Sequence, residues 1–515
     1  MDASSLRRAF TGYFADRGHL VRPSASLIPD DPTLLFTVAG MVPFKPYFLG
    51  QETPPAARLV TVQKCVRAGG KHNDLDEIGR TSRHLTFFEM MGNFSFGDYF
   101  KDDAIPYAWE FVTEVLGLDP ERLWVTVHLS DDEAEAIWID KVGVPPERVQ
   151  RLDSDNWWAA GDTGPCGPCS EIFYDKGPKF GADGGPAHGG EDRFIEIWNL
   201  VFMQHERDEA GVLHDLASKG IDTGAGLERI LTILQGVDSV FEIDEMVPLI
   251  ARAAELTGRT YGDDEASDLS LRILAEHARS TSMLVSDGVF PSNEDRGYVL
   301  RRIIRRAVRH AYLLGVETPV MAELVDRVVE VMGSDYPELV SNQQFIRGVI
   351  GREEQSFRRT LASGSAILDA ELEKLPEAQV LNGEVVFRLH DTYGFPLEVT
   401  QEILSERGVE LDLDGFETCM RQQRDRARAA GMRGSGPADT ERYKEILDEF
   451  GETEFVRDAD VATTRVLAVL GTEGDDDIHE IFLQRTSFYA ESGGQVGDTG
   501  VLRGPGGEVE VLDTT

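Results

Sequence analysis

An apolar, strand-like segment ends in Cys65-Val66-Arg67-Ala68-Gly69-Gly70-Lys71-His72-Asn73, where a glycine-rich polar loop begins. A second strand-like segment starts at Thr86, so the pattern predicts two strands joined by a long loop. Arg67, at the end of the first strand, can hold a phosphate with the two-pronged geometry that lysine lacks. Lys71 in the loop can reach a further substrate. The same spacing fits a hairpin with a solvated charged loop, and spacing alone leaves both interpretations open.

A second informative segment reads Ile221-Asp222-Thr223-Gly224-Ala225-Gly226-Leu227-Glu228-Arg229. Asp222 can bind an ammonium group, and Gly224 allows a ligand to approach the backbone closely. Arg229 follows at the start of an apolar helix. Taken alone, the segment fits a glycine-rich strand-to-helix turn with a capping acid better than a ligand site.

The first half of the chain alternates helical and strand-like patterns. Apolar residues recur at helical spacing from Leu6 to Tyr13, and buried strands are predicted at 33–38, 86–91 and 194–203. Glycine-rich turns separate these segments. This order predicts an α+β fold in which an antiparallel sheet is flanked by helices, closing a first domain at about residue 240.

The second part of the chain is predicted to be mainly helical. Its apolar stripes begin near Asp268, and a charged helix comes last. We therefore expect a helical domain over residues 241–435. The segments that mark its helices are 271–277, 300–308, 346–372 and 421–428.

A new β domain is predicted at the end of the sequence. A flexible linker at 431–437 precedes strand-like runs at 464–470 and 480–483. The strand-like pattern is still running at Thr515. We therefore expect residues 436–515 to hold a linker and the beginning of a β domain that is incomplete in this sequence.

The composition sets limits on function. Hydrophobic residues make up 41% and charged residues 28% of the 515 positions, which fits a water-soluble globular protein with real cores. The net charge of −40 argues against non-specific binding of nucleic acid, since phosphate contacts need lysine and arginine. Net charge does not describe one local patch, however, so a basic surface on an acidic body remains compatible with it.

Other sequence features narrow the setting. The four cysteines are too few for a disulfide framework, which favours a reducing, cytoplasmic location. No uninterrupted apolar stretch approaches the roughly 18 residues of a membrane span. The common glycine-rich nucleotide motifs are missing. Any ATP site must therefore use another design, such as an antiparallel sheet with arginines aimed at the triphosphate.

Together, the two segments around Arg67 and Arg229 resemble motifs 2 and 3 of the class II aminoacyl-tRNA synthetases. More narrowly, the chain resembles the alanyl-tRNA synthetase family over essentially its whole length. The further strings that carry this resemblance are Asp31-Pro32-Thr33-Leu34-Leu35-Phe36, Thr86-Phe87-Phe88-Glu89-Met90, Asp162-Thr163-Gly164-Pro165-Cys166-Gly167-Pro168-Cys169, Ile197-Trp198-Asn199 and Arg296-Gly297-Tyr298-Val299-Leu300-Arg301-Arg302.

The resemblance implies a two-step reaction that joins alanine to ATP and then passes alanine to the 3′ end of its tRNA. Arg67 and Arg229 are then the catalytic residues: Arg67 holds the α-phosphate, and Arg229 packs on the adenine or reaches the γ-phosphate. Glu196 is expected to help hold Mg²⁺. The implied ATP-binding residues are Arg67, Phe88, Glu196, Ile197 and Arg229. The implied alanine-binding residues are Trp158, Asn199, Val201, Asp222 and Gly224.

A basic helix is the expected contact for the tRNA acceptor stem. Five arginines, at 301, 302, 305, 306 and 309, are predicted to cover one helical face. The alternative is a solvated face paired with acids. By resemblance, Asn293 and Asp391 read base edges in the RNA minor groove. The implied tRNA-binding residues are Lys71, Asn293, Arg301, Arg305 and Asp391.

Two further points concern metals and proofreading. Residues 488–498 resemble the start of the family's editing domain, so zinc is expected only in the missing remainder and no editing is expected here. Cys166 and Cys169 form a C-x-x-C pair, but zinc needs about two more ligands, and the next histidines are His188 and His205. We expect a tight Gly-Pro turn at this pair and no metal site.

Two other functions are compatible with the pattern. One is a synthetase-like protein that binds tRNA or an adenylate without ligating them, which loss of Arg67, Asp222 or Arg229 would favour; all three are present. The other is a related ligase that charges another small amino acid or a carrier. The family's dimerisation region is not in this sequence, so a monomer is expected.

Overall fold

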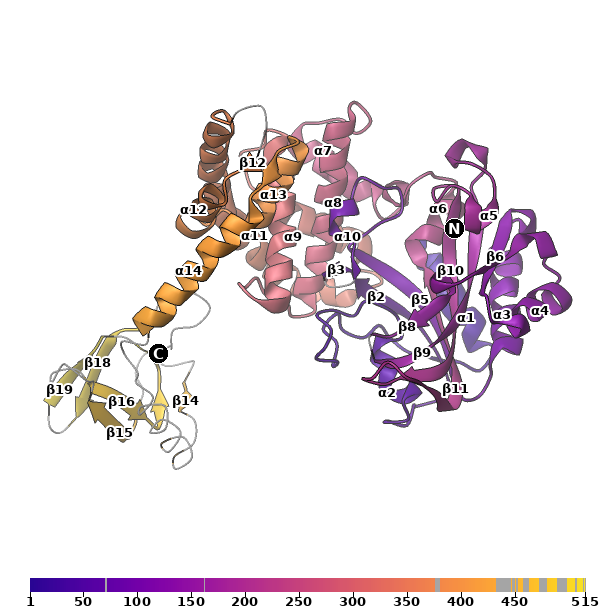
Figure 1. Ribbon diagram of the computed structural model, residues 1–515, viewed down its shortest axis with the longest axis horizontal. Coiled ribbons are helices and arrows are strands. Elements are labelled where there is room, and N and C mark those ends of the chain that lie inside the picture. Colours follow the sequence, from indigo (N-terminus) through magenta and orange to yellow (C-terminus); the bar gives the residue numbers. More distant parts are fainter. Residues whose placement is uncertain are drawn as a thin grey trace. The chain divides into compact units, whose positions relative to one another are not determined.

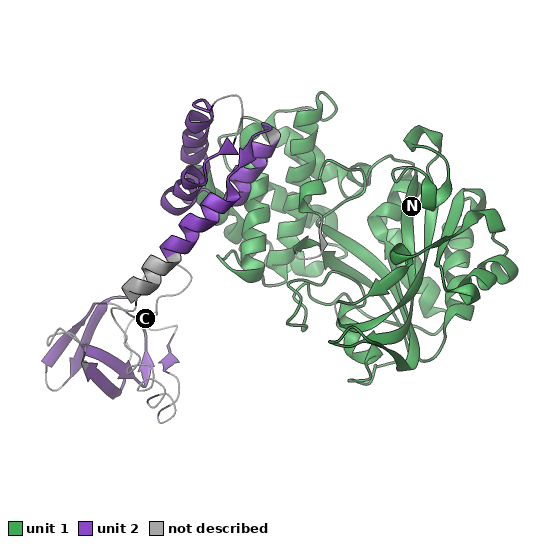
Figure 2. Cartoon of the chain, viewed as in Figure 1, with its two compact units in different colours: residues 1–358 green, residues 359–515 purple. Residues whose placement is uncertain are grey.

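A computed structural model describes residues 1–69, 72–161, 163–375, 380–431, 446, 450, 453–456, 463–471, 479–488, 498–504, 507–512 and 514. The chain divides into two compact units, residues 1–358 and residues 359–515 (Figure 2). None of the helices in these described ranges is long and apolar enough to cross a bilayer.

The first unit is built on a sheet of nine described strands (Figure 1). Their order is β1-β2-β5-β11-β10-β9-β6-β7, with β8 beside β9. Only the β1–β2 and β6–β7 pairs are parallel. This confirms the predicted antiparallel sheet and two of its predicted strands, 86–91 and 194–203. The strands are β1 (Leu20–Val21), β2 (Arg58–Val66), β5 (Phe87–Phe96), β6 (Leu123–His128), β7 (Val149–Leu152), β8 (Trp157–Ala159), β9 (Gly164–Asp175), β10 (Phe194–Arg207) and β11 (Leu213–Gly226). A small hairpin, β3 (Ala68–Gly69) and β4 (His72–Asn73), follows β2.

Helices cover one face of this sheet. The helix α1 (Ala3–Ala15) begins where the side chain of Asp2 accepts a hydrogen bond from the Ser5 N–H, as a helix cap does. Its buried Phe10 packs on Trp198 of β10, with ring centres 5.6 Å apart. The predicted helix at the N-terminus is therefore confirmed. The shorter helices of this unit are α2 (Lys45–Phe48), α3 (Lys101–Glu110), α4 (Asp132–Ala136) and α5 (Gly185–His188).

The opposite face of the sheet is covered mainly by irregular chain, together with the short helix α2, whose Phe48 belongs to the apolar cluster on this face. The strand predicted at 33–38 is wrong, because no strand forms there. Leu34 and Val38 instead pack on an apolar cluster that includes Phe94 and Val201. Their apolar character thus comes from covering the sheet, not from joining it.

The remaining helices of the first unit form a bundle beside the sheet. The helix α8 packs on α7, α9 and α10, and also contacts β5. The predicted helical segments near Asp268 and at 300–308 are confirmed. The bounds are α6 (Leu227–Gln235), α7 (Val247–Thr257), α8 (Glu265–Ser286), α9 (Asp295–Leu313), α10 (Met321–Met332) and α11 (Pro337–Leu372), the last of which continues into the second unit.

The second unit combines helices with small sheets. The helix predicted at 421–428 is part of α14, and the strands predicted at 464–470 and 480–483 form β15 and β16. Most of the predicted linker lies outside the described residues. The three predicted domains, with boundaries near 240 and 435, stay a prediction. The elements are α12 (Gly383–Tyr393), α13 (Leu397–Glu406), α14 (Leu413–Gly431), β12 (Val380–Leu381), β13 (Glu410–Leu411), β14 (Glu454–Phe455), β15 (Val466–Gly471), β16 (His479–Leu483), β17 (Arg485–Thr486), β18 (Gly500–Gly504) and β19 (Gly507–Val511).

Candidate active site

Strand register places the predicted alanine-binding residues on one face of the sheet. Val201 of β10 lies opposite Asp222 of β11, and Asn199 lies opposite Gly224. On the other side of β10, Glu171 of β9 lies opposite Asn199. Paired residues of antiparallel strands point to the same face, as do alternate residues along one strand. The side chains of β9, β10 and β11 at these positions therefore form one continuous surface.

Arg67 and Phe88 meet where β2 and β5 run side by side. Cys65 lies opposite Phe88 in the register, and Arg67 follows directly after β2. The guanidinium carbon of Arg67 lies 5.0 Å from the ring centre of Phe88. The Arg67 Nε also donates a hydrogen bond of 3.2 Å to the carbonyl of Val38 in the covering segment. The arginine is thus held between an aromatic ring and the irregular chain above the sheet.

A pocket opens over these strands. It is also lined by Gly224, which connects it to the predicted alanine-binding surface. The structure thus brings together all of the predicted ATP-binding residues, although their roles stay a prediction. Those that line the pocket are Arg67, Phe88, Glu196, Ile197 and Arg229.

Arg229 is held by a carboxylate in the same pocket. It stands in the first turn of α6, which begins directly after β11 ends at Gly226. Its guanidinium donates to the Glu196 carboxylate at 3.0 Å and to the Glu196 carbonyl at 3.2 Å. Both side chains are partly exposed, at 26% and 35%. The two predicted ATP ligands therefore form an ion pair whose charges both face the pocket.

Asp222 is a buried carboxylate without a counter-ion. The residue is 5% exposed, and no described side chain or N–H donates a hydrogen bond to its carboxylate. Burial alone raises the pKa of Asp222 to about 7. Such a group gains much from a bound cation, because the cation replaces the hydration that burial removed.

Asn199 supplies a second unsatisfied oxygen on the same face. Its Nδ2 donates to the Glu171 Oε1 at 2.9 Å, which fixes the orientation of the amide. Its Oδ1 is buried and has no hydrogen-bond partner among the described residues. Because Asn199 and Asp222 sit on adjacent strands with their side chains on one face, two unpaired acceptors border the same small region.

Apolar side chains pack next to the region that Asn199 and Asp222 border. Trp158 of β8 packs against the cluster that contains Val201 and Cys169. A Cβ atom added to Gly224 would lie 2.7 Å from the Sδ of Met90, so there is little space above that position. Trp158, Met90 and Val201 thus belong to one apolar cluster on this face of the sheet.

Sequence reasoning missed Glu171. Its carboxylate is 8% exposed, and burial, followed by the nearby charge of Glu196, raises its pKa well above the ordinary range. Thr126 donates to its Oε2 at 3.3 Å. The available signal was an acidic residue in the run Cys169-Ser170-Glu171-Ile172-Phe173, which contains no other charge.

Other residues that line the pocket were also missed. Arg83 and His84 lie four and three residues before β5 begins, so their place near a predicted phosphate-binding strand was a usable signal. Val240 comes from a distant turn, and no local pattern marks it. The additional lining residues are Asp74, Arg83, His84, Leu85, Met90, Gly226, Glu228 and Val240.

The predicted tRNA-binding residues are only partly brought together. Arg301 donates a hydrogen bond to the Oδ1 of Asn293, so these two meet at the start of α9. Arg305 and Arg301 both pair with Glu353, at 2.8 and 3.4 Å. The predicted role of these residues is untested by the fold.

Two predicted tRNA-binding residues lie apart from this group. Asp391 belongs to the second unit, where its exposed carboxylate accepts a hydrogen bond from Gln423. Lys71 lies outside the described residues. The prediction that both contact tRNA therefore rests on the sequence alone.

The single basic face predicted for α9 is wrong. Arg306 and Arg309 are only 6% and 2% exposed, whereas Arg301, Arg302 and Arg305 are partly exposed. A guanidinium NH of Arg306 lies 3.0 Å from the Nε2 of buried His277. Five arginines within nine residues wrap around more than one face of a helix, so some of them turn into the bundle.

The Gly-Pro turn predicted at Cys166 and Cys169 is also wrong. Both cysteines are buried within the strand β9. A Cβ atom added to Gly167 between them would lie 2.0 Å from the carbonyl oxygen of Phe202, where the pairing of β9 with β10 is irregular. The glycine therefore permits close approach of two strands and does not mark a turn. Across the described residues, no group of three or more metal-ligand side chains forms.

Comparison with known proteins gives the family. The profile of the family described as "tRNA synthetases class II (A)" matches residues 5–515. The chain belongs to this family. It is 52% identical over 538 aligned residues to a protein of Streptomyces avermitilis named "Alanine--tRNA ligase". Proteins of the same name from Acidithiobacillus ferridurans and Chromohalobacter salexigens are 50% and 52% identical. Each comparison covers 100% of this chain and 59–60% of the relative, so the chain spans about 60% of the length of these relatives.

Proposed function

We propose that this chain activates alanine with ATP to form alanyl-adenylate and pyrophosphate, and then transfers alanine to the 3′ end of alanine tRNA. The observation that carries the proposal is the pair of unsatisfied acceptors, the Asp222 carboxylate and the Asn199 Oδ1, next to a pocket with two arginines. An ammonium group has three donors and no acceptor, so it suits these two oxygens. The relatives named "Alanine--tRNA ligase" support alanine as the amino acid whose ammonium group binds here.

The first step needs positioning more than proton transfer. The alanine carboxylate is ionised at neutral pH, so no protein base is required for its attack on the α-phosphorus. The new carboxyl–phosphorus bond forms as the bond to the β-phosphate oxygen breaks, and pyrophosphate leaves. Arg67, whose guanidinium lies over the ring of Phe88, holds the α-phosphate and stabilises the charge that gathers there. Asp222 fixes the alanine ammonium, so that the carboxylate points toward the nucleotide.

Glu196 of the pocket is suited to bind a magnesium ion. Mg²⁺ prefers oxygen ligands and is commonly shared with substrate phosphates, where it neutralises phosphate charge. Glu196 offers an oxygen that lines the pocket, and the charge of Glu196 already bears on the neighbouring Glu171. A cation here relieves the repulsion between the two carboxylates. Glu196 is thus the proposed protein ligand, and it leaves Arg229 free to contact ATP.

The second step transfers alanine to a ribose hydroxyl at the tRNA end, with release of AMP. We propose that Lys71 meets this end of the tRNA. Arg301, Arg305 and Asn293 are the proposed acceptor-stem contacts, and Asp391 is a proposed base reader. Arg301 and Arg305 must then exchange Glu353 for phosphate when tRNA binds.

We propose that the site selects its amino acid by the size of the side chain alone. The space over Gly224 is closed by Met90, so larger side chains are excluded. Glycine still fits, and one methylene is worth only about 1–3 kcal/mol of discrimination. The predicted beginning of an editing domain, residues 488–498, lies almost wholly outside the described residues. We propose that the chain acts as a monomer in the cytosol.

The deciding experiment is ATP–pyrophosphate exchange with alanine, glycine or serine as the amino acid. Alanine is expected to support the fastest exchange, with glycine and serine slower. A chain that shows no alanine-dependent exchange is not this enzyme, and a binding protein or a ligase for another substrate then becomes the better reading. In the same preparation, Asp391→Ala is expected to reduce tRNA charging far more than exchange. Equal loss of both activities would refute the role proposed for Asp391.

A further inference from the structure

Close to the nucleotide pocket, the strand β5 is paired with a neighbouring strand on one side only. On one side it pairs with β2 as far as Phe87. On the other side its pairing with β11 reaches only Met90, because β11 ends at Gly226 and the chain turns into α6. Phe87 and Glu89 therefore present backbone groups on a side where no described strand lies. Buried N–H and C=O groups left without partners would cost a large part of the stability of this strand.

Three charged side chains take the place of the missing strand. The Glu228 carboxylate accepts from the Glu89 N–H at 3.1 Å. Arg279 of α8 donates to the Phe87 carbonyl at 2.7 Å. One oxygen of Glu276, also in α8, accepts from the Phe87 N–H at 3.1 Å. All three residues are at most 2% exposed. They form a side-chain edge that continues the sheet where main-chain pairing stops.

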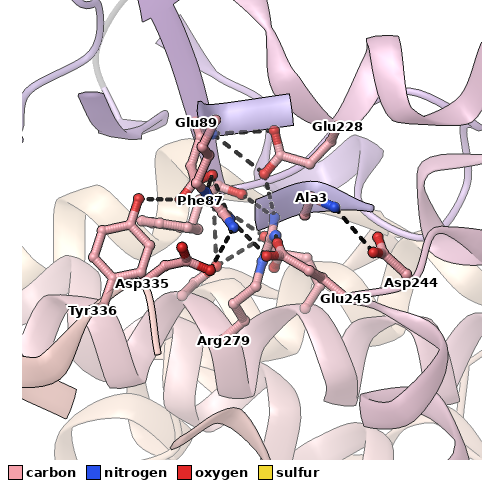
Figure 3. A network of polar contacts seen from close by, with 12 residues as sticks. Ala3, Phe87, Glu89, Glu228, Asp244, Glu245, Arg279, Asp335 and Tyr336 are labelled. Atoms are coloured by element: carbon pink, nitrogen blue, oxygen red, sulfur yellow. Dashed lines mark hydrogen bonds and ion pairs between the residues drawn. The ribbon is translucent and has the colours of Figure 1, made fainter. Parts of the chain in front are cut away.

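The members of the side-chain edge also bind one another and their neighbours. Arg279 donates to Glu228 at 3.0 Å, and Figure 3 shows both residues converging on Phe87 and Glu89. The Glu276 oxygen that binds β5 also accepts from the N–H of Thr86 at 2.6 Å. The other oxygen of Glu276 lies 2.6 Å from the Nδ1 of His277.

A second arginine anchors the far side of β5. Arg7 of α1 pairs with both Glu89 and Glu245, each at 2.6 Å. Tyr336 also donates a hydrogen bond to Glu89. The side chain of Glu89 is thus held on the face of β5 that lies away from the pocket.

Phe88 lies between these clamped residues and points the other way. It lines the pocket and carries the guanidinium of Arg67 on its ring. The Arg67 N–H also donates to the carbonyl of Thr86 at 2.9 Å. Any shift of β5 at Thr86–Glu89 therefore moves both side chains that the proposed function assigns to ATP.

We propose that Arg279 and Glu276 are positioning residues for nucleotide binding. They stand in for a sheet neighbour of β5 and so hold Phe88 and Arg67 in place, although neither lines the pocket. The proposal rests on the proposed function in one respect, since it takes ATP as the ligand of that pocket. It predicts that loss of Arg279 weakens ATP binding more than alanine binding.

The test compares Arg279→Met with a matched control, Arg358→Met. Arg358 likewise donates to a backbone carbonyl, that of Val316 at 2.8 Å, and to a fully buried glutamate, Glu354 at 2.9 Å. Neither residue belongs to the pocket, so the control reports on the loss of an arginine that binds a buried glutamate and a backbone carbonyl, although the side chain of Arg358 itself is 12% exposed. Each variant of the full chain is measured for its melting temperature, for binding of ATP with Mg²⁺ and no amino acid, and for exchange kinetics.

Arg279→Met is expected to raise the Kd and the KM for ATP at least about tenfold, while the KM for alanine changes less than about twofold. Arg358→Met is expected to lower the melting temperature without changing either ATP constant. If Arg279→Met does not fold, the milder Arg279→Lys replaces it in the test. Lysine keeps the charge and reaches one acceptor, so its KM for ATP is expected to lie between that of the wild type and a tenfold increase. The double variant Glu228→Gln/Arg279→Met removes the unpaired carboxylate, and its ATP constants are expected to stay weak.

The proposal is overturned if folded Arg279→Met or Arg279→Lys binds ATP like the wild type, or if the KM values for ATP and alanine rise by the same factor. Recovery of ATP binding in the double variant would also overturn it, because the defect would then be an unpaired charge. If the wild type binds ATP but shows no alanine-dependent exchange, the proposed function fails while the binding comparison still decides the role of Arg279.

Discussion

Replacing Asp222 with asparagine provides the sharpest test of the proposed alanine site. The wild-type carboxylate is buried with no described partner, and its pKa is raised to about 7 from 3.8. In the unfolded chain it titrates near the ordinary value. Between these two pH values the folded state binds more protons than the unfolded state, so the free energy of unfolding falls as pH rises. The loss is complete once the pH passes the folded pKa.

The magnitude follows from the size of the shift. A difference of about three pKa units, at about 1.4 kcal/mol per unit, corresponds to about 4 kcal/mol. Asparagine has nearly the same volume and no charge, so Asp222→Asn lacks this pH-dependent loss. Relative to the wild type, the variant is therefore expected to gain about 4 kcal/mol of stability between pH 4 and pH 8. Other titrating groups cancel in the comparison because both proteins contain them.

Urea denaturation of ligand-free wild type and variant at several pH values from 4 to 8 measures this difference. Asp264→Asn is a suitable control, since Asp264 caps α8 and a hydrogen bond from Ser267 lowers its pKa. Its stability difference is expected to be flat over pH 5–8. Parallel curves for wild type and Asp222→Asn would refute the reasoning, because they would mean that the carboxylate is hydrated or paired.

The same group sets an expectation for catalysis. The alanine ammonium stabilises the charged carboxylate, so binding of alanine below pH 7 must release a proton. The KM for alanine in exchange is then expected to rise as pH falls through about 7, with the KM for ATP changing less. A KM for alanine that is constant between pH 6 and pH 8 would contradict the assignment of Asp222.

Two further substitutions test the surroundings of the site. Gly224→Ala places a methyl group 2.7 Å from the Sδ of Met90, so the KM for alanine is expected to rise at least about tenfold in exchange assays while the KM for ATP is little changed; an unchanged KM for alanine would place the amino acid elsewhere. Glu353→Gln releases Arg301 and Arg305 from their shared carboxylate, so the KM for tRNA is expected to fall a few-fold at low salt with exchange unaffected; a higher KM would show that the pairing presents these arginines to the RNA.

Local patterns in the sequence were sufficient for the regular elements. The strand at 86–91 and the helix that begins just before Arg229 follow from apolar spacing and glycine placement, and both are present. The convergence of Arg67, Phe88 and Arg229 on one pocket came from family resemblance, since their separation in the chain hides it.

The wrong predictions share a physical cause: contacts with residues distant in sequence decide where a residue lies, whatever its local pattern indicates. Leu34 is apolar because it covers the sheet, and Gly167 is a glycine because Phe202 lies against it. Arg306 is buried because its guanidinium lies within hydrogen-bond distance of His277 in the neighbouring helix α8. None of these partners is near in sequence, so no local pattern could reveal them. The same holds for Glu276 and Arg279, which look like ordinary charged residues of a helix.

The side-chain edge of β5 has a consequence for how this molecule can be divided. A boundary near residue 240, as the order of strand-like and helical segments predicts, would separate the sheet from Glu276 and Arg279 of α8. A fragment ending there would carry every residue that lines the pocket, yet would leave part of its central strand open to water. The smallest piece able to form the adenylate should therefore extend at least to Ser286, where α8 ends. The helix α8 packs within the bundle, but its Glu276 and Arg279 complete the hydrogen bonding of the sheet.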